Sequence, residues 1–356
     1  MIESIDQRHG GGTPDDVPAA PVITVAVCSF NGADRIGAAL KALNQQVHST
    51  PFEVIVVDDG SSDDTAAIAA QAGATVIRLD ENLGRGSALQ QATKMARGVI
   101  LAMVDDDCVP SPDWVQRLAE EWRQAPREVT VIGGSVRPLA VDSFNRRYVE
   151  FREPLRALEL EGDRNPGFAS RLRRALLPCP HGTGRRAVRS TAGANMSVRL
   201  SALREVGGFD PKIHFGGEEE EVCRRLQDAH GPETVQFVPD MEMPHDFRPN
   251  LGDSLRRARA YGRSHGERYA REGGIPTVQP IPLLIAGLLA PLFAWRFKLG
   301  TFALALLPLL LYRGWFRRCQ ETSTAEPMLY PYVRLIEDLA GELGFVEGLL
   351  AKIRSG

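Results

Sequence analysis

The stretch from Val99 to Trp114 constrains the fold more than any other part of the chain. It begins with six apolar residues, Val99 to Val104, which is typical of a strand buried on both faces of a parallel sheet. Three consecutive acids follow, Asp105, Asp106 and Asp107. Carboxylates are costly to bury unless they are paired or bound to a cation, and open α/β sheets place ligands at the carboxyl ends of their strands. The pattern therefore indicates either a divalent-metal site or a solvated acidic turn.

Composition limits the alternatives. The 356 residues are 43% apolar and 24% charged, enough for a large core in one extended domain or in two. The net charge of −3 argues against a general nucleic-acid binder. Five scattered cysteines without CxxC spacing favour a reducing compartment without disulfides or a zinc site. Residues 1–21 are polar, rich in Gly and Pro and lack an apolar signal region, so they are expected to form a flexible tail.

The first hundred residues alternate β-branched apolar runs with helical patterns. Strands are predicted at 22–29, 52–57, 74–79 and 99–104, and helices at 36–46, 65–72 and 87–97. This alternation predicts βαβ units, and hence an α/β fold with a mainly parallel sheet and helices on both faces. No GxxxxGK[ST] motif is present, and Leu89 occupies the third position of a GxGxxG-like segment. A P-loop protein and a dehydrogenase are both disfavoured.

Six segments follow one another between residues 22 and 226. They read VAVCSFNGADRIGAAL, FEVIVVDDGSSDDT, NLGRGSALQQATKMARG, VDDDCVPSPDW, GANMSVRLSALREVGGFDP and GGEEEEVCRRL. In order and spacing they resemble family 2 glycosyltransferases of the GT-A type. The resemblance implies a catalytic domain over residues 22–275 that binds a nucleoside-diphosphate sugar. In that family a DxD motif holds a divalent metal, Mg²⁺ or Mn²⁺, against the diphosphate.

The resemblance also assigns donor and metal roles to particular residues. The expected donor-binding residues are Ser29, Asn31, Asp58, Asp59, Arg85, Asp105 and Asp106. The expected metal ligands are Asp105, Asp107 and His245. An oxygen-rich set of this kind suits a hard cation. Two alternatives remain open: Asp58 or Asp59 instead caps the following helix, and His245 is instead structural or contacts phosphate.

The acidic run from Gly216 to Glu221 matches the position where the family has its catalytic base. Glu219 aligns with an acid that is usually Asp, and Glu218 is the fallback. An inverting transfer needs one carboxylate to take the proton of the attacking hydroxyl, and neighbouring acids raise its pKa towards a useful value. The alternative is a charged first helical turn favoured by the helix dipole. The segments from Gly193 to Ser197 and from Gly207 to Asp210 resemble acceptor-side segments of the family.

Two apolar stretches, Ile281–Trp295 and Leu299–Tyr312, lie near the C-terminus. As helices they would each span only about 21–23 Å, which is short of the ~30 Å hydrocarbon core of a bilayer. Residues 276–320 are therefore expected to form an apolar helical pair that associates with a membrane at its interface. Helices buried in protein or at the interface of a homo-oligomer are the alternative.

Two further segments, residues 321–356 and 164–189, have distinctive apolar and basic patterns. Residues 321–356 are expected to form an amphipathic helix whose apolar stripe, from Val333 to Ile353, packs against the preceding helices or a partner. Residues 164–189 hold seven arginines and no acid. This suits a phosphate-bearing lipid acceptor or an anionic membrane surface, and the alternative is a solvated loop.

The sequence thus predicts an inverting, metal-dependent glycosyltransferase that works at the inner, cytoplasmic face of a membrane. Its acceptor is expected to be a hydroxyl of a lipid-linked or cell-envelope glycan or of a small molecule. One alternative is a catalytically inactive, membrane-bound scaffold, which the Glu at position 219 would suit. A nucleotidyltransferase is less favoured because the first strand ends in Ser29-Phe30-Asn31-Gly32 rather than in a glycine-rich loop followed by Lys.

Overall fold

The computed structural model describes residues 22–153, 155, 157–160, 184–273 and 324–355, together with 306, 308, 312 and 315. The predicted tail (1–21) lies outside the described residues, as do most of the arginine-rich segment and most of the predicted membrane-associated pair (276–320). Within the described ranges, no helix has both the length and the apolar character that crossing a bilayer requires.

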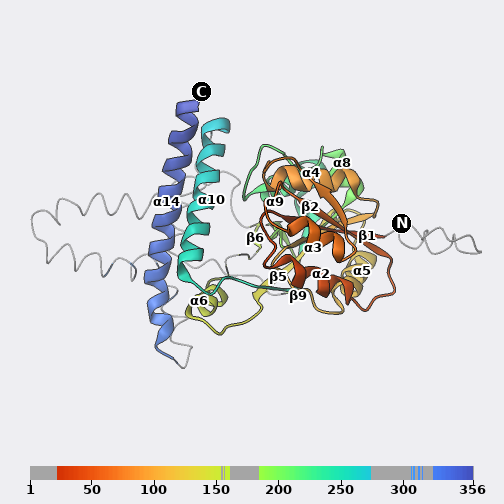
Figure 1. The fold of residues 1–356 in the computed structure, drawn as a ribbon, viewed down its shortest axis with the longest axis horizontal. Coiled ribbons are helices and arrows are strands. Elements are labelled where there is room, and N and C mark those ends of the chain that lie inside the picture. Colours follow the sequence, from red (N-terminus) through yellow and green to blue (C-terminus); the bar gives the residue numbers. More distant parts are fainter. Residues whose placement is uncertain are drawn as a thin grey trace, which may run out of the picture.

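A nine-stranded sheet forms the centre of the described part of the α/β domain (Figure 1). The strands lie in the order β3-β2-β1-β4-β8-β5-β9-β7-β6. Their bounds are β1 Ile23–Ser29, β2 Phe52–Asp58, β3 Thr75–Arg78, β4 Ile100–Asp105, β5 Val131–Pro138, β6 Leu158–Glu159, β7 Arg186–Ser190, β8 Asn195–Arg199 and β9 Val235–His245. Buried β-branched and apolar residues fill β1 and β4, as strands covered on both faces require.

The prediction of a mainly parallel sheet holds for β1 to β4 and for the pair of β5 with β9, and is wrong for the other pairs. β1 pairs in parallel with β2 and with β4, and β2 does so with β3. However, β8 runs antiparallel to both β4 and β5, and β7 runs antiparallel to β9. β8 begins only a few residues after the end of β7. β7 and β8 nevertheless run in the same direction and are not neighbours, since β5 and β9 lie between them.

Helices cover both faces of the sheet, as predicted. On one face, buried residues of α2, α3 and α5 pack on β1 and β4; on the other, those of α4, α8 and α9 pack on β2, β4 and β8. The bounds of these helices are α2 Ile36–Asn44, α3 Thr65–Gln71, α4 Arg85–Met95, α5 Trp114–Gln124, α8 Leu200–Glu205 and α9 Glu218–His230. The buried indoles of Trp114 and Trp122 on α5 donate hydrogen bonds to Asn195 and Ser197 of β8. These bonds fix the antiparallel strand beside β4.

Two long helices stand side by side next to the α/β domain (Figure 1): α10, Leu251–Glu272, and α14, Tyr330–Ser355. Their backbones lie in direct contact through glycines. A Cβ at position 262 would lie 1.9 Å from the carbonyl oxygen of Gly341, and one at position 344 would lie 2.0 Å from that of Arg259. Small residues allow this close approach of two helices because no side chain separates their backbones.

The predicted C-terminal helix is present but packs through a different face. A 3₁₀ turn, η2 Glu326–Leu329, precedes α14. Of the predicted apolar stripe, Val333 is buried, whereas Ile336, Leu343, Val346 and Leu350 are exposed. These four residues do not pack against α10. Instead, the glycines of α14 face α10, and glycines permit closer contact between two helices than large apolar side chains do. Most of the predicted helical pair (276–320) lies outside the described residues, so packing of the stripe against that pair or against a partner stays a prediction.

The glycine contact provides a stability prediction. Gly262→Ala is expected to lower the free energy of unfolding by about 1–3 kcal/mol, the usual cost of overpacking, because the new methyl group would overlap the Gly341 backbone. Gly252→Ala, on the same helix, is the matched control: its Cβ would meet only the flexible end of Arg256, at 3.6 Å. That change is expected to stabilise by about 0.5 kcal/mol through the unfolded state. Urea unfolding of both variants measures the difference, and equal effects would contradict the contact.

A buried polar cluster attaches α14 to the α/β domain through α6, Phe144–Arg152. Glu337 of α14 is 2% exposed, accepts a hydrogen bond from the Tyr148 hydroxyl and pairs with Arg152 at 2.8 Å. Around it, Tyr330 packs against Phe144 and Tyr148 with ring centroids 5.4–5.7 Å apart. Since breaking a buried ion pair is costly, this cluster fixes the position of α14 along the domain.

Candidate active site

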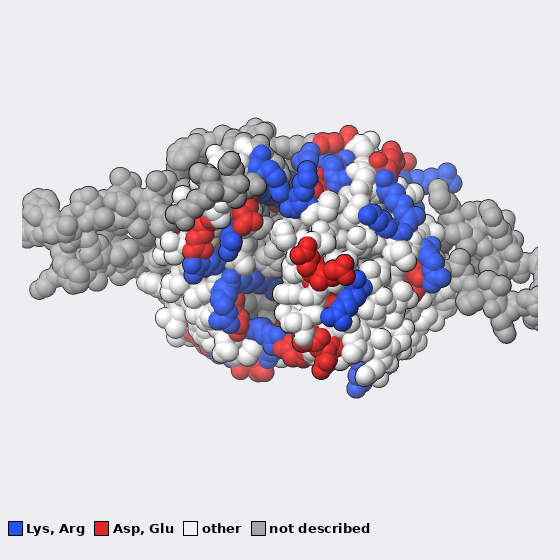
Figure 2. Space-filling view, turned by 45° about the horizontal axis from the view of Figure 1, so that its top comes forward, with Lys and Arg blue, Asp and Glu red and all other residues white. Residues whose placement is uncertain are grey.

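A cavity of about 630 Å³ opens at the carboxyl ends of β1 and β4 and extends to α9 and α10. The strand register brings the ends of β1, β2 and β4 side by side, because Ser29 lies opposite Asp58 and Cys28 lies opposite Asp105. One face of the molecule is hollowed, and basic and acidic side chains stand close together around the hollow (Figure 2). The arrangement is the one expected for a ligand site of an open α/β sheet.

Of the acids after β2, the structure places Asp59 in the cavity and Asp58 behind it. Asp59 lines the cavity and accepts hydrogen bonds from the backbone N–H groups of Leu83 and Gly84, at 2.8 and 2.9 Å. Burial raises the pKa of Asp59. Asp58 is fully buried, accepts from the Ser61 N–H at 3.0 Å and lies 3.5 Å from Arg78. Its contacts are those of a turn, so the predicted donor role of Asp58 rests on the family resemblance alone.

Ser29, Asn31 and Asp106 shape the edge of the cavity in different ways. Ser29 and Asp106 both line the cavity, and the Ser29 hydroxyl donates to the Asp106 carboxylate. Arg35 donates to the other carboxylate oxygen from Nε at 2.8 Å. Asn31 instead accepts a hydrogen bond from the N–H of Ser62 at 2.9 Å and has φ +48°. It shapes the loop after β1 and is not among the residues that line the cavity.

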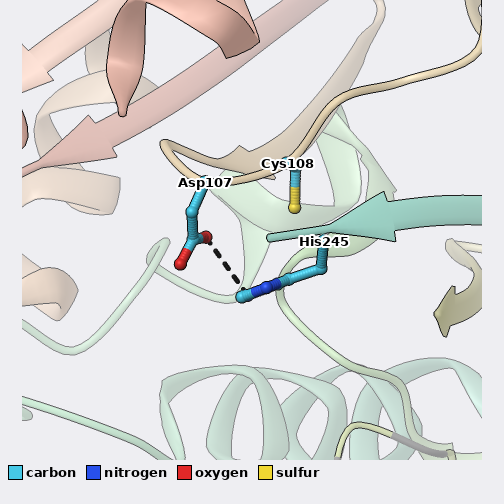
Figure 3. Close-up of side chains that lie close together, drawn as sticks. All are labelled: Asp107, Cys108 and His245. Atoms are coloured by element: carbon cyan, nitrogen blue, oxygen red, sulfur yellow. Dashed lines mark ion pairs between the residues drawn. The ribbon is translucent and has the colours of Figure 1, made fainter. Parts of the chain in front are cut away.

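Asp107 and His245, two of the metal ligands that the resemblance implies, lie side by side in the structure (Figure 3). The His245 Nε2 atom lies 3.1 Å from Asp107 Oδ1, and Cys108 is the third neighbour. His245 ends β9 and forms an isolated β-bridge with Cys108. Phe247 stacks on the imidazole with ring centroids 4.1 Å apart. The turn after β4 and the end of β9 thereby hold a carboxylate and an imidazole in fixed relation.

The donor set fits a divalent cation. Burial, aided by the charge of Arg257, lowers the pKa of His245 to about 4, so its imidazole is neutral at pH 7 and has a lone pair to share. Neither ring nitrogen of His245 has a hydrogen-bond partner among the described residues. Burial and the charge of Asp105 raise the pKa of Asp107 to about 6, and a nearby cation would favour its charged form. Cys108 suits Mg²⁺ or Mn²⁺ less, since burial keeps it a thiol.

Asp105 is held by an arginine in this structure rather than by the Asp107–His245 pair. Arg85, at the first position of α4, lies 2.6 Å from Asp105 Oδ1 through Nη1 and 2.7 Å from Glu218 Oε1 through Nε. Although burial opposes it, the charge of Arg85 lowers the pKa of Asp105. Arg85 thus joins an acid of the DxD motif to the first acid of α9, a connection that the sequence did not reveal.

Glu219, the predicted base, faces the same cavity. Burial and the neighbouring charge of Glu218 raise the pKa of Glu219 to about 8, and its Oε2 atom has no hydrogen-bond partner in the described part of the chain. A Cβ at Gly193 would lie 2.9 Å from Arg85 Nη2 and 3.7 Å from Glu219 Cδ. The absence of a side chain at position 193 therefore leaves room for Arg85 and Glu219 to approach each other.

Several cavity residues escaped the sequence analysis. They are Arg35, His214, Phe215, Arg256, Arg257 and Tyr261. The i, i+4 spacing of Arg257 and Tyr261 places both on one face of α10, but nothing distinguishes them from the other arginines and tyrosines of the sequence. Conversely, Arg185, Arg186 and Arg189 of the arginine-rich segment are each paired with a glutamate, at 2.9, 2.6 and 3.1 Å. The predicted free positive charge is therefore absent at these three positions.

Comparison with known proteins bears on this site. Residues 24–184 match the family model described as "Glycosyl transferase family 2". The matched part includes the strand ends with Ser29, Asp59 and the Asp105–Asp107 triplet. It does not reach α9, β9 or α10, so Glu219 and His245 lie beyond it.

Curated relatives of the chain carry glycosyltransferase names. A glucosyl-dolichyl phosphate glucuronosyltransferase of Haloferax volcanii is 26% identical over 60% of this chain and 66% of its own length. A pre-mycofactocin glycosyltransferase of Mycobacterium tuberculosis is 27% identical over 87% of this chain and 61% of its own. The chain thus spans less than two thirds of the length of either relative.

The fold is a mixed α/β fold of GT-A type. A mannosyltransferase from Pyrobaculum calidifontis, solved in complex with GDP-Man and Mn²⁺, superposes with a TM-score of 0.52. The match covers 98% of this chain and 94% of that chain at 18% identity. At this identity the likeness extends to the fold alone.

Proposed function

We propose that this chain is a metal-dependent, inverting glycosyltransferase that moves a sugar from a nucleoside-diphosphate sugar to a hydroxyl acceptor. The observation that carries the proposal is that one cavity is lined both by Asp107, which lies 3.1 Å from His245, and by Glu219, whose carboxylate has an oxygen without a hydrogen-bond partner among the described residues. The family match of residues 24–184 and the names of the relatives support it. The similar mannosyltransferase structure contains both a nucleotide sugar and Mn²⁺.

The donor is assigned to the strand ends. Asp59, Ser29 and Asp106 line this part of the cavity with hydrogen-bonding oxygens, which suit ribose hydroxyls and base N–H groups. Asp107, His245 and Asp105 would hold Mg²⁺ or Mn²⁺. When bound there, the cation would supply positive charge beside the diphosphate leaving group.

The acceptor is assigned to the side of Glu219. Its carboxylate takes the proton of the acceptor hydroxyl while the hydroxyl oxygen bonds to the anomeric carbon. The bond from that carbon to the diphosphate oxygen breaks, and its electron pair leaves with the nucleoside diphosphate. Attack from the face opposite the leaving group inverts the anomeric centre. A lipid-linked acceptor is supported by the name of the Haloferax relative.

A thermal-shift panel tests the donor and metal assignments. UDP, GDP, dTDP and CDP are each added with and without Mn²⁺ to the wild type, to Asp107→Asn and to Asp228→Asn. One nucleotide is expected to stabilise the wild type only with Mn²⁺, by about 2.7 kcal/mol at roughly 100 Kd. The shift should vanish in Asp107→Asn and persist in Asp228→Asn, because Asp228 pairs with Arg224 on α9. No shift with any nucleotide would contradict the proposal, and binding without release of nucleoside diphosphate from a sugar donor would favour the inactive scaffold.

We also propose that the chain works at the inner, cytoplasmic face of a membrane. Tyr332, Ile336, Leu343, Val346 and Leu350 of α14 are exposed at helical spacing, and an apolar helix face of this kind binds at lipid interfaces. Co-sedimentation with anionic phospholipid vesicles tests it. Leu343→Ser combined with Leu350→Ser should reduce binding, and a wild-type chain that stays in the supernatant would exclude the proposal.

A further inference from the structure

The wall of the cavity that α10 forms contains two arginines, Arg256 and Arg257, and one tyrosine, Tyr261. Arg257 and Tyr261 are one helical turn apart and both line the cavity. The Arg257 guanidinium forms a hydrogen bond with the Tyr261 side chain and lies 5.8 Å from the centre of its ring. The two side chains therefore form a paired unit with a fixed spacing.

Arg257 differs in its partners from the other arginines around the cavity. Arg35 pairs with Asp106, Arg85 with Asp105 and Glu218, Arg248 with Asp34, and Arg256 with Asp253. For Arg257, no carboxylate lies within ion-pair distance among the residues that the structure describes; Asp105 and Asp107 act on it only from farther away. A guanidinium removed from water without an anion is costly, and its planar donor set matches phosphate and carboxylate groups.

The loop before α9 completes this wall. Phe215 is 37% exposed and packs against Tyr261 with ring centroids 4.7 Å apart. The neighbouring Gly216 has φ +76°, and a Cβ there would lie 2.4 Å from the Tyr261 ring. Because position 216 has no side chain, the loop lies directly on Tyr261. The result is an open aromatic surface next to a cation without an ion-pair partner.

The location of this wall separates it from the donor side. Tyr261 lies close enough to Glu218 and Glu219 for their charges to affect its ionisation. If Glu219 is the base, the attacking hydroxyl must lie beside it. We propose that Arg257 and Tyr261 bind a negatively charged group, of the phosphate-ester type, on the acceptor. This inference rests on the proposed function and narrows its acceptor to an anionic compound.

The test compares glycerol 3-phosphate with uncharged glycerol as probes. Binding is measured by saturation-transfer NMR on the full chain, with and without Mn²⁺ and the nucleotide that stabilises it in the thermal-shift panel. The wild type is expected to bind glycerol 3-phosphate and not glycerol. Arg257→Gln should weaken the binding about 10- to 100-fold, the usual effect of losing a hydrogen bond to a charged group. Arg257→Lys keeps the charge without the planar fork and should lose less.

Two controls test whether the loss of binding is specific to Arg257 and to the acceptor side of the cavity. Arg263→Gln is the matched control, because Arg263 lies on α10, pairs with Glu267 on the same helix and does not line the cavity; it should bind like the wild type. Nucleotide and Mn²⁺ binding should be unchanged in Arg257→Gln. Equal binding of glycerol 3-phosphate by wild type and Arg257→Gln would overturn the inference. So would an equal loss of nucleotide binding, which would assign Arg257 to the donor diphosphate. Failure of the wild type to bind any nucleotide would count against the proposed function instead.

Discussion

Glu219→Gln is expected to reduce the rate of sugar transfer by about 10²- to 10⁴-fold, the usual contribution of a general base. The change removes the carboxylate that accepts the proton but keeps the size of the side chain. Nucleotide binding with Mn²⁺ should remain, because Glu219 is not one of the donor or metal residues. The effect should therefore appear in kcat rather than in the affinity for the donor.

The pH dependence of the wild type gives a second readout of the same group. Burial and Glu218 raise the pKa of Glu219 to about 8, so the side chain is mainly protonated below that pH and cannot accept a proton. The rate should rise with pH as Glu219 ionises, and a bound cation should move this rise to lower pH. The pH dependence of the rate is measured by following the release of nucleoside diphosphate from the donor between pH 5 and pH 9.

Glu220→Gln is the matched control. Glu220 is adjacent in sequence but pairs with Arg189 at 3.1 Å and does not line the cavity, so its loss should leave the rate within about twofold, as for other exposed ion pairs. An active Glu219→Gln together with an inactive Glu218→Gln would assign the base to Glu218. Full activity of both variants would refute a carboxylate base on α9.

Arg85→Gln is expected to destabilise the protein by about 3 kcal/mol, in the range found when one partner of a buried ion pair is removed. Glu218 is 2% exposed, and both it and Asp105 would lose their nearest positive charge. The two carboxylates would then have raised pKa values in the folded state. Because the folded variant would bind more protons than the unfolded chain, its loss of stability should be smaller at pH 5 than at pH 8.

Urea unfolding at the two pH values measures this effect. Arg224→Gln is the control, since Arg224 forms its ion pairs on the exposed surface of α9 and should change stability by less than about 1 kcal/mol. Mn²⁺ should restore part of the stability of Arg85→Gln, because a cation at Asp105 replaces the lost charge. A variant as stable as the wild type at pH 8 would show that Arg85 is not needed to hold the two acids.

Local patterns predicted the first half of the fold well. β1, β2 and β4 each contain a run of apolar residues, and buried helix residues such as Ile36 and Leu40 recur at helical spacing. The direction of β8 could not be predicted in this way, because it depends on which strands receive residues 195–199, a property of tertiary structure. The face through which α14 meets α10 could not be predicted for a related reason: apolar periodicity identifies a helix face but not which of two faces meets a given neighbouring helix.

Site residues could be predicted best where a sequence motif follows the end of a strand. Asp107 and His245 are 138 positions apart in the sequence, and their meeting could be expected only from the family resemblance. Arg257 and Tyr261 carried no such signal, because α10 has many arginines and only the packed structure shows which of them faces the cavity. Long-range pairs such as Arg85 with Glu218 are equally inaccessible to local patterns.

α10 both forms a wall of the cavity and lies in close contact with α14. Tyr261, in the cavity wall, is the immediate neighbour of Gly262, whose backbone lies against Gly341 of α14. The contact with α14 and the wall of the cavity are therefore separated by one residue of α10. A chain shortened to lack α14 is therefore expected to lose support for the cavity wall at Tyr261.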